Sequence, residues 1–286
     1  MSFWLIQSLN SLALGGVLFT LAAGFSLIFG LMRIANLSHG AYFMLGAYVG
    51  LSVINHGHGF LVALLAAGLA VGVLGAVVER LVLRRLAGNS LGQVLATLGI
   101  AFIIADFSLW VWGGDPQPVD APDFLAGSTQ LFGQVFPLYR VGVVGFAILL
   151  AISLWLLLDK TRLGMMIRAS VDDMQMARGI GIPASRLFTI VFCLGTALAG
   201  IGGVIAAPIL SVYPGMDSDM LPLALVVVIL GGLGSLAGAF IGSFVIGFIY
   251  SFGQVLFPDL AYIILFLPMV VILAVRPRGL FGRIAV

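Results

Sequence analysis

DKTRLGMMIRASVDDMQMARGIGIPASR, residues 159–186, is the stretch around which this chain is organised. It holds eight of the 24 charged residues of the chain (13 Lys and Arg, 11 Asp and Glu) in less than a tenth of its length. The sequence on both sides of this polar segment is apolar enough for a lipid bilayer. A polar, helix-forming segment between such hydrophobic blocks predicts a place where a soluble partner protein binds.

The composition places the chain in a membrane. It is 62% hydrophobic and 8% charged, with 38 glycines and a mean hydropathy of +1.21. Soluble domains carry about 25% charged residues. We therefore expect an all-α polytopic membrane protein, with residues 1–286 forming one domain and no separate soluble domain.

Nine apolar stretches are candidates for membrane passage. A straight helical span needs about 20 apolar residues, and the stretches 39–54 and 222–232 are short. Depending on whether 222–232 crosses or re-enters, the sequence predicts eight to ten transmembrane or half-membrane helices. The stretches are residues 5–29, 39–54, 60–78, 91–112, 141–158, 187–212, 222–232, 236–256 and 260–275.

The charges predict the orientation, because Lys and Arg in short loops stay in the cytosol. Lys160 and all arginines except Arg140 fall on one side if nine segments cross. The polar segment and the C-terminus are then cytosolic, and residues 113–140 form the long outer loop. Most aspartates outside the polar segment fall on the outer side. The outer loop, which contains four prolines and several aromatic residues, is a candidate surface for an extracytoplasmic partner or a solvated cap.

The motifs that the sequence lacks argue against an enzyme. Lys160 is the only lysine, and it does not end a GxxxxGK loop, so no phosphate-binding loop is present. HExxH and Cys/His clusters of metal-binding spacing are also missing. His56 and His58 alone are too few ligands for a metal site. We expect no catalytic residue, no bound metal and no cofactor on this chain.

Two ionisable residues are predicted to lie within the bilayer, Asp106 and His39. Such residues are functional candidates by default. Asp106 lies about two turns from the outer end of its span. One interpretation makes Asp106 a polar site within the membrane, which would be the coupling group of a proton- or sodium-driven secondary transporter. The other makes it a structural residue whose carboxylate reaches Arg140.

Two stretches read as broken helices beside a pathway, residues 30–40 and 230–238. Asn36 and Ser38 are suitable N-caps for a helix that starts at His39 and Gly40. The free N–H groups at such a start can meet a polar substrate group. The alternative interpretation of each break is a simple turn between two helices. Glycines four residues apart elsewhere (46/50, 68/72 and 234/238/242) indicate close helix packing within the fold, or a dimer seam.

The polar segment itself predicts one amphipathic helix that ends at Gly179 and Gly181. A Met-rich apolar face suits an adaptable groove on a partner, and the alternative is a helix on the bilayer surface. Arg168 and Asp172 have the spacing of an ion pair. The apolar face consists of Met165, Met166, Ala169, Met176, Ala177 and Ile180.

Three motifs together carry a resemblance to a known family. RASVDDMQMARGIGI (residues 168–182) resembles the coupling loop of bacterial ABC-importer permeases. GLMRIANLSHGAYFMLGAYVG (30–50) and VVVILGGLGSLAGAFIGSFVIG (226–247) resemble segments of branched-chain amino-acid permeases of the LivH type. Their order and spacing match that family over nearly the whole chain.

The resemblance implies an inner-membrane pathway subunit without catalytic activity. It would pair with a second, related permease, bind two cytosolic ATPase subunits that hold ATP and Mg, and receive branched-chain or related amino acids from a periplasmic binding protein. The ATPase contact would comprise Arg168, Ala169, Asp173, Met176, Ala177 and Gly181. The substrate pathway would comprise Asn36, Ser38, His39, Gly40, Gly231, Gly232 and Gly234. Ser38 stands where the family more often has alanine, which bears on the substrate.

Overall fold

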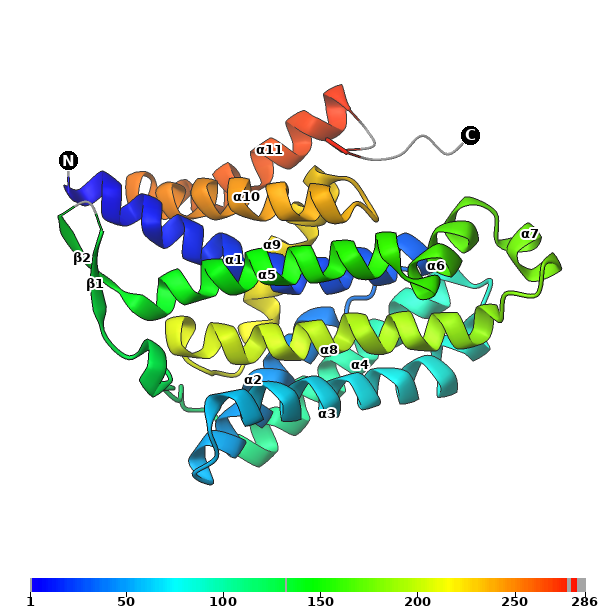
Figure 1. Cartoon of the computed structure of the whole chain (residues 1–286), viewed down its shortest axis with the longest axis horizontal. Helices are drawn as coiled ribbons and strands as arrows, with labels where there is room; N and C mark the ends of the chain where they lie inside the picture. Colours follow the sequence, from blue (N-terminus) through cyan, green and yellow to red (C-terminus); the bar gives the residue numbers. More distant parts are fainter. Residues whose placement is uncertain (1, 132, 277–278, 282–286) are drawn as a thin grey trace.

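The computed structural model describes residues 2–131, 133–276 and 279–281 and is almost entirely helical (Figure 1). In chain order the elements are α1 (Ser2–Met32), α2 (His39–Asn55), α3 (Phe60–Leu81), η1 (Leu83–Leu86), α4 (Ser90–Trp112), η2 (Asp123–Leu125), β1 (Ser128–Leu131), β2 (Gln134–Pro137), α5 (Leu138–Lys160), α6 (Arg162–Asp172), α7 (Met174–Gly179), α8 (Ala184–Leu210), α9 (Met216–Gly231), α10 (Leu236–Leu256), η3 (Pro258–Leu260) and α11 (Ala261–Val275).

The predicted fold class, an all-α polytopic membrane protein, is confirmed. Each of the nine predicted apolar stretches coincides with a helix. Among the described residues, six helices are long and apolar enough to cross a membrane. The remaining three, α2, α9 and α11, have 17, 16 and 15 residues. Figure 1 shows α5, α8 and α10 along the long dimension of the molecule, with α9 inclined between them.

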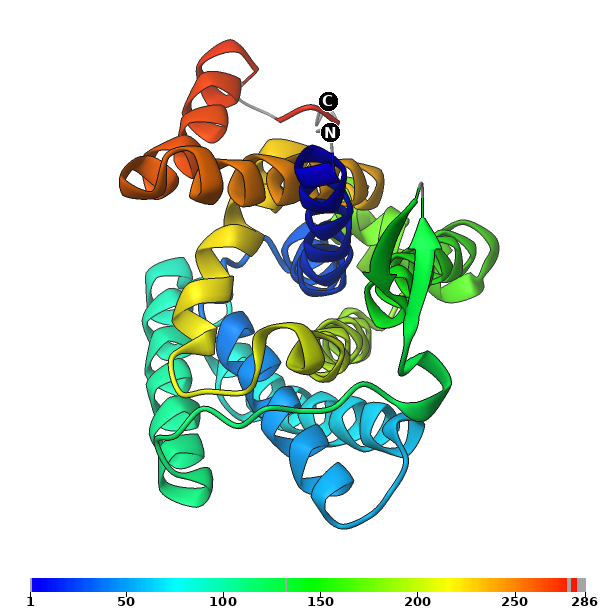
Figure 2. The ribbon, with the colours of Figure 1, turned by 90° about the vertical axis from the view of Figure 1, so that its left-hand side faces the viewer.

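The centre of the bundle is formed by α1 and α8. Seen from the end that carries β1 and β2, these two helices lie toward the middle, and α3, α4, α5 and α11 lie around them (Figure 2). Helix α8 packs on α1, α2 and α3, and α1 also packs on α10 and α5. The largest fully buried side chains include Tyr42, Phe19 and Phe192, from α2, α1 and α8.

Glycines allow α8 to approach its neighbours at backbone distance. A Cβ atom at Gly203 would overlap the carbonyl oxygen of Phe43 in α2, and one at Gly46 would overlap the backbone of Gly200. On the other side, a Cβ at Gly195 would lie 2.6 Å from Ile28 of α1. The prediction that Gly46 and similar glycines serve packing within the fold is thus confirmed, and these faces are not free to form a dimer seam.

The outer loop contains a hairpin that the sequence analysis did not predict. Strands β1 and β2 pair antiparallel, with Thr129 opposite Phe136. The preceding chain is fixed to the end of α8 by a backbone bridge between Gln117 and Val212. The hydroxyl of Tyr139 donates to the carbonyl oxygen of Ile205 at 2.7 Å, so the loop is held to α8 at both ends.

The glycine contacts of α8 predict a specific stability difference. Gly203→Ala should destabilise the protein by about 1–3 kcal/mol, because the added methyl group forces α2 and α8 apart. Gly145→Ala in α5 is the matched control, since a Cβ there meets nothing within 4 Å. Thermal unfolding in detergent should show a clear loss for the first variant and none for the second. Equal behaviour of the two variants would contradict the packing argument.

Candidate functional site

The start of α2 is buried inside the bundle. Asn36, Ser38 and His39 are at most 1% exposed. The Oδ1 atom of Asn36 accepts hydrogen bonds from the backbone N–H of Ser38 (3.2 Å) and from its hydroxyl (2.6 Å). Ser38 occupies the predicted N-cap position, but its side chain makes no capping hydrogen bond. The backbone N–H of Leu37 donates to Oγ1 of Thr97 in α4 at 3.2 Å.

His39 connects this start to the middle of α1. Its Nε2 lies 3.0 Å from the carbonyl oxygen of Leu21, and its ring stands edge-on to Phe25 at 5.4 Å. Leu21 is 11 residues before the end of α1, which corresponds to about 16 Å along the helix. Helix α2 therefore begins deep within the bundle. Among the described atoms, Nδ1 of His39 and Nδ2 of Asn36 have no hydrogen-bond partner.

The start of α9 lies against the start of α2. A Cβ atom at Gly40 would lie 2.5 Å from the carbonyl oxygen of Asp217 and 2.9 Å from Cβ of Leu221. Only a glycine permits this contact between two short helices. In this conformation, residues 36–40 are enclosed by α1, α4 and α9, and do not line an open channel.

The second predicted break meets the first one at Gly30, the residue where the first break begins, and not at the start of α2. Gly232 and Gly234 have φ values of +103° and +80° and form the turn between α9 and α10. Gly234 faces Gly30 near the end of α1, nine residues or about 13 Å along the helix from Leu21. Gly231 contacts the backbone of Gly238. The structure thus does not bring Gly231, Gly232 and Gly234 together with residues 36–40.

The polar segment forms two helices, so the prediction of one continuous helix is wrong. Asp173 interrupts it, because its carboxylate caps α7 by accepting from the backbone N–H groups of Gln175 and Met176, both at 2.9 Å. The predicted Arg168–Asp172 pair is also replaced. Arg168 contacts the carbonyl oxygen of Leu158 and pairs with Asp159 at 3.2 Å. The predicted end at Gly179 is confirmed.

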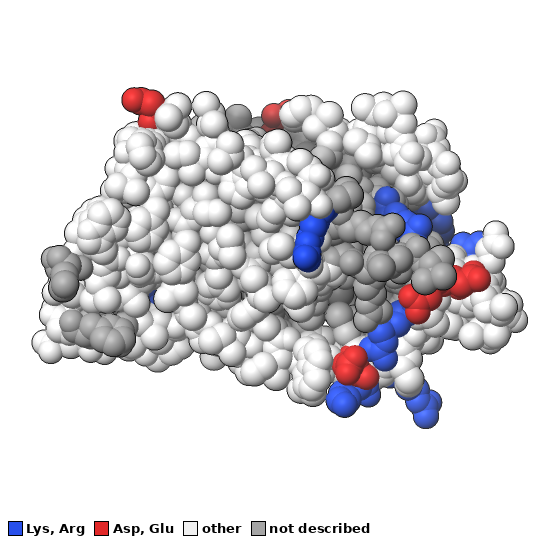
Figure 3. Space-filling model, turned by 90° about the horizontal axis from the view of Figure 1, so that it is seen from above, with Lys and Arg blue, Asp and Glu red and all other residues white. Residues whose placement is uncertain are grey.

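The predicted apolar face is divided by this break. Met176 and Ile180 are 64% and 69% exposed around α7, and Met165 is exposed on α6. Ala177, in contrast, is 2% exposed, and its carbonyl oxygen accepts from the backbone N–H of Ile182. Ala169 is half-buried and Gly181 is exposed with φ +90°. Figure 3 shows basic side chains gathered at the end of the molecule that carries α6 and α7.

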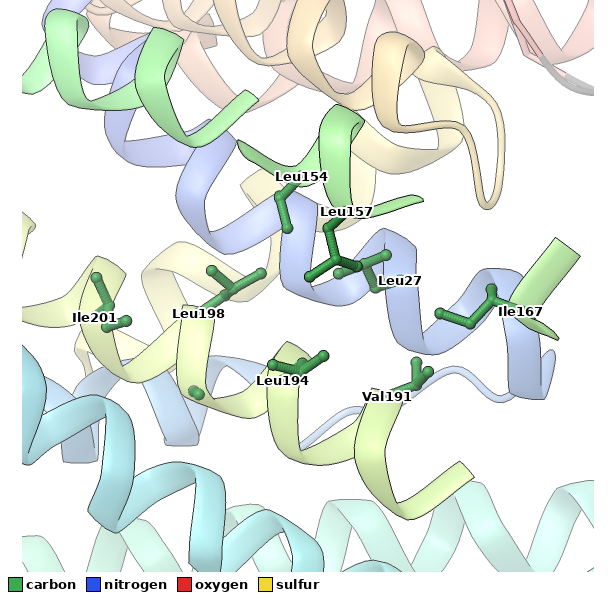
Figure 4. A pocket seen from close by; sticks show the side chains of 9 residues that line it. Leu27, Leu154, Leu157, Ile167, Val191, Leu194, Leu198 and Ile201 are labelled. Carbon is green, nitrogen blue, oxygen red and sulfur yellow. The ribbon is translucent and has the colours of Figure 1, made fainter. Parts of the chain in front are cut away.

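Helix α6 is fixed to the membrane-spanning helices. Ile167 is buried in a cluster with Leu31, Leu187 and Val191, which come from the ends of α1 and α8. Beside this cluster, an apolar cavity of about 130 Å³ separates α5 from α8 (Figure 4). The turn from α5 into α6 requires glycine, because a Cβ at Gly164 would overlap the carbonyl oxygen of Leu158.

A buried acidic site that the sequence analysis missed joins α3 to the start of α8. Glu79 is 1% exposed, and its carboxylate accepts from Arg84 at 2.9 Å and from the hydroxyl of Thr189 at 2.7 Å. Arg84 also donates to the carbonyl oxygen of Ser185 at 2.8 Å. The sequence signal was the Glu–Arg spacing at the end of an apolar span. This cluster holds the first turns of α8, directly after the polar segment.

Asp106 does not lie inside the bundle. Its side chain is exposed on α4, and no ion pair or hydrogen bond of its carboxylate is found in the described part of the chain. The partner suggested for it, Arg140, instead donates to Asn10 of α1.

The described residues contain no group of three or more potential metal ligands. The Nδ1 atom of His56 lies 2.7 Å from the carbonyl oxygen of Ser52.

Comparison with known proteins identifies a matching family. The family model of the permease component of branched-chain amino acid transport systems matches residues 7–273. The permease proteins BraD of Pseudomonas aeruginosa and LivH of Escherichia coli, both from high-affinity branched-chain amino acid transport systems, are each 25% identical to this chain. Each alignment covers 98% of this chain and 96% of the relative. A probable LivH from Methanocaldococcus jannaschii is 28% identical over 81% of this chain and 75% of its own length.

The Glu79 cluster gives a stability prediction. Glu79→Gln should lower the free energy of unfolding by about 1–3 kcal/mol, because the hydrogen bonds that Arg84 and Thr189 donate to the carboxylate are weakened, while Arg84 stays half-exposed to solvent. Arg80→Gln removes one charge of the opposite sign at an exposed neighbouring position, and should stay within about 0.5 kcal/mol of the parent. Thermal unfolding of both variants in detergent tests this. An unaffected Glu79→Gln protein would show that the cluster does not hold α8.

Proposed function

Because this chain belongs to the family of permease components of branched-chain amino acid transport systems, we propose that it forms the translocation pathway of an importer for branched-chain or related amino acids. It is a multi-pass subunit of an ABC importer in the bacterial inner membrane and is not itself an enzyme. In the proposed assembly, a second related permease completes the pathway, and two ATPase subunits in the cytosol bind and hydrolyse ATP with Mg. This chain binds no cofactor.

The observation that carries the ATPase contact is the exposed apolar surface of α7. Met176 and Ile180 project from the end of the molecule where basic residues gather, which fits the cytosolic side. An exposed methionine on a short helix suits an adaptable groove of a partner protein. Ala177 supports α7 from within, so its contribution to the contact is to position the helix rather than to touch the ATPase.

The connections of α6 and α7 support a mechanical role. Helix α6 packs on the ends of α1 and α8 through Ile167, and α7 leads into α8 within four residues. The Glu79 cluster joins the first turns of α8 to α3. A displacement of α7 by ATP binding on the partner would therefore move α8, α3 and α1 together.

The start of α2 is the proposed gate of the pathway. Asn36, Ser38, His39 and Gly40 are enclosed by neighbouring helices, so substrate passage requires α9 to separate from α2. The glycine turn at Gly231–Gly234 tolerates such a change of angle between α9 and α10, because positive φ values cost glycine little. Polar groups at the start of α2 would then meet the amino acid.

The outer loop is the proposed binding surface for the periplasmic binding protein. Phe124 is 62% exposed and Val135 is 65% exposed, whereas Phe136 is buried. The hairpin and the Gln117–Val212 bridge hold this surface to the outer end of α8. Binding of the periplasmic protein would thus act on α8 from the outer side, and the ATPase would act on the same helix through α7 from the cytosol. In the proposed topology, the N-terminus is on this outer side and the C-terminus is cytosolic.

The proposed ATPase contact predicts the effect of one added charge. Met176→Asp should weaken ATPase association at least about tenfold, because a carboxylate would be buried in an apolar groove. Gln175→Glu adds the same charge to the same short helix beside the apolar pair and should leave association intact. Co-purification of the ATPase subunits with each variant, at equal permease levels in the membrane, measures the difference. Unchanged association for Met176→Asp would exclude α7 from the contact.

The energy source gives an independent prediction. Uptake of labelled leucine into cells should stop when ATP is depleted at an intact membrane potential, and unlabelled isoleucine and valine should compete with it. Asp106→Asn should retain uptake, since no proton on this residue is needed. Uptake that persists without ATP and requires Asp106 would instead identify a gradient-driven carrier.

A further inference from the structure

Helix α4 is attached to this chain along one narrow stripe. It packs on α2 and η1, and its buried residues recur at three- and four-residue spacing. The stripe consists of Gln93, Thr97, Ala101, Ile104 and Ser108. Most of the other residues of the helix are exposed, and Figure 2 shows α4 at the edge of the bundle.

The exposed side of α4 is apolar except for one carboxylate. Phe102 is 63% exposed, Ile103 69% and Trp110 82%. Asp106 lies on the same side, four residues from both Phe102 and Trp110. Gly99 also lies on this side, and a Cβ atom there would meet nothing within 4 Å. The face thus combines large apolar groups, one charge and a point where another helix can approach closely.

Asp106 is too deep in the membrane to be solvated at the surface. It lies six residues, or about 9 Å, from the outer end of a helix about 34 Å long. Trp110 and Trp112 come after it, and tryptophan marks the interface of the bilayer. Its short side chain cannot extend past them to water. Ionisable residues at such depth face protein or a water-filled cavity, because lipid does not compensate their charge.

The other exposed helix faces differ from that of α4. The exposed sides of α3 and α5 are formed by residues such as Leu65, Leu69, Leu149 and Ile152, which suit lipid. Among the described Asp, Glu, Lys and Arg residues of α1, α3, α4, α5, α8 and α10, Asp106 is the one exposed residue that lies more than a turn from either helix end. The charge therefore distinguishes the α4 face from the lipid-facing surface.

We propose that the exposed face of α4 around Gly99, Phe102 and Asp106 is the interface with the second permease subunit. The inference rests on the proposed function and adds to it the surface by which the two permeases associate. Phe102 and Trp110 pack against the partner, Gly99 admits the close approach of a partner helix, and a polar or basic group of the partner hydrogen-bonds Asp106.

Position excludes the other subunits as occupants of this face. Asp106 lies 16 residues, or about 24 Å, from the cytosolic start of α4, so an ATPase in the cytosol does not reach it. A binding protein outside the membrane is separated from it by the turn of helix that carries Trp110 and Trp112. A membrane-embedded protein is the partner that fits this depth.

Site-specific photo-crosslinking in the native membrane tests the interface. A benzophenone amino acid replaces Phe102 in one variant and Leu149 of α5 in the control, which has a similar exposure of 61% and a similar depth. We expect the probe at 102 to give an adduct that mass spectrometry identifies as permease to permease. The probe at 149 should give none. An adduct at 102 with lipid only, or with any protein other than a permease, overturns the proposal.

A second measurement uses Asp106 itself. Asp106→Leu should weaken permease–permease association by about 10- to 100-fold, since the polar group of the partner loses its charged acceptor. Asp106→Asn should largely restore association. If lipid faced this side, the leucine variant would associate as well as the parent, which would overturn the interface. If ATPase subunits fail to co-purify even with the parent chain, the proposed function is refuted. If they co-purify but the probe at 102 gives no permease adduct, only the proposed α4 interface is refuted.

Discussion

The backbone contact between α8 and the helices around it is the constraint on which the rest of the structure depends. In a bilayer, helices gain no hydrophobic free energy from associating, so close van der Waals packing must hold them. Gly203 brings α8 against α2, Gly200 brings it against α3, and Gly195 brings it against α1. With a larger residue at any of these points, the helix would stand away from its neighbours. The central position of α8, and with it the placement of α2, follows from these absent side chains.

The buried polar groups at the start of α2 are compatible with the bilayer because the glycine contacts bring partners within reach. An unpaired polar group in hydrocarbon is costly. Asn36 accepts twice from Ser38, Thr97 accepts from the backbone of Leu37, and His39 reaches the carbonyl oxygen of Leu21. Helix α2 can therefore begin within the bundle instead of at the membrane surface. The same arrangement leaves Nδ1 of His39 and Nδ2 of Asn36 without a described partner at the proposed gate.

Composition and hydropathy were sufficient to predict the helices, because burial in lipid is decided by residue type over about 20 positions. Contacts between distant residues were not predictable in this way. Asp173 resembles any charged residue of an amphipathic helix until its side chain is seen to cap α7. Glu79 has a local partner in Arg84, but its burial also depends on Thr189, which lies 110 residues later in the chain. The exposure of Asp106 depends on which side of α4 packs on α2, and the hydrophobic pattern of a membrane helix does not encode that side.

The strength of these contacts differs around the bundle, and this difference limits which parts can move. Helices α1, α2, α3, α8 and α10 are joined by glycine contacts, and the Glu79 cluster joins α3 to the start of α8. Helix α4 is held by one stripe, and α5 packs mainly on α1 with an apolar cavity between it and α8. A rearrangement that preserves the glycine contacts among these five helices must therefore move them as a unit, with α4 and α5 shifting against them. The polar segment is attached to this unit through α6 and α8. A movement of α7 would therefore displace the unit relative to α4 and α5.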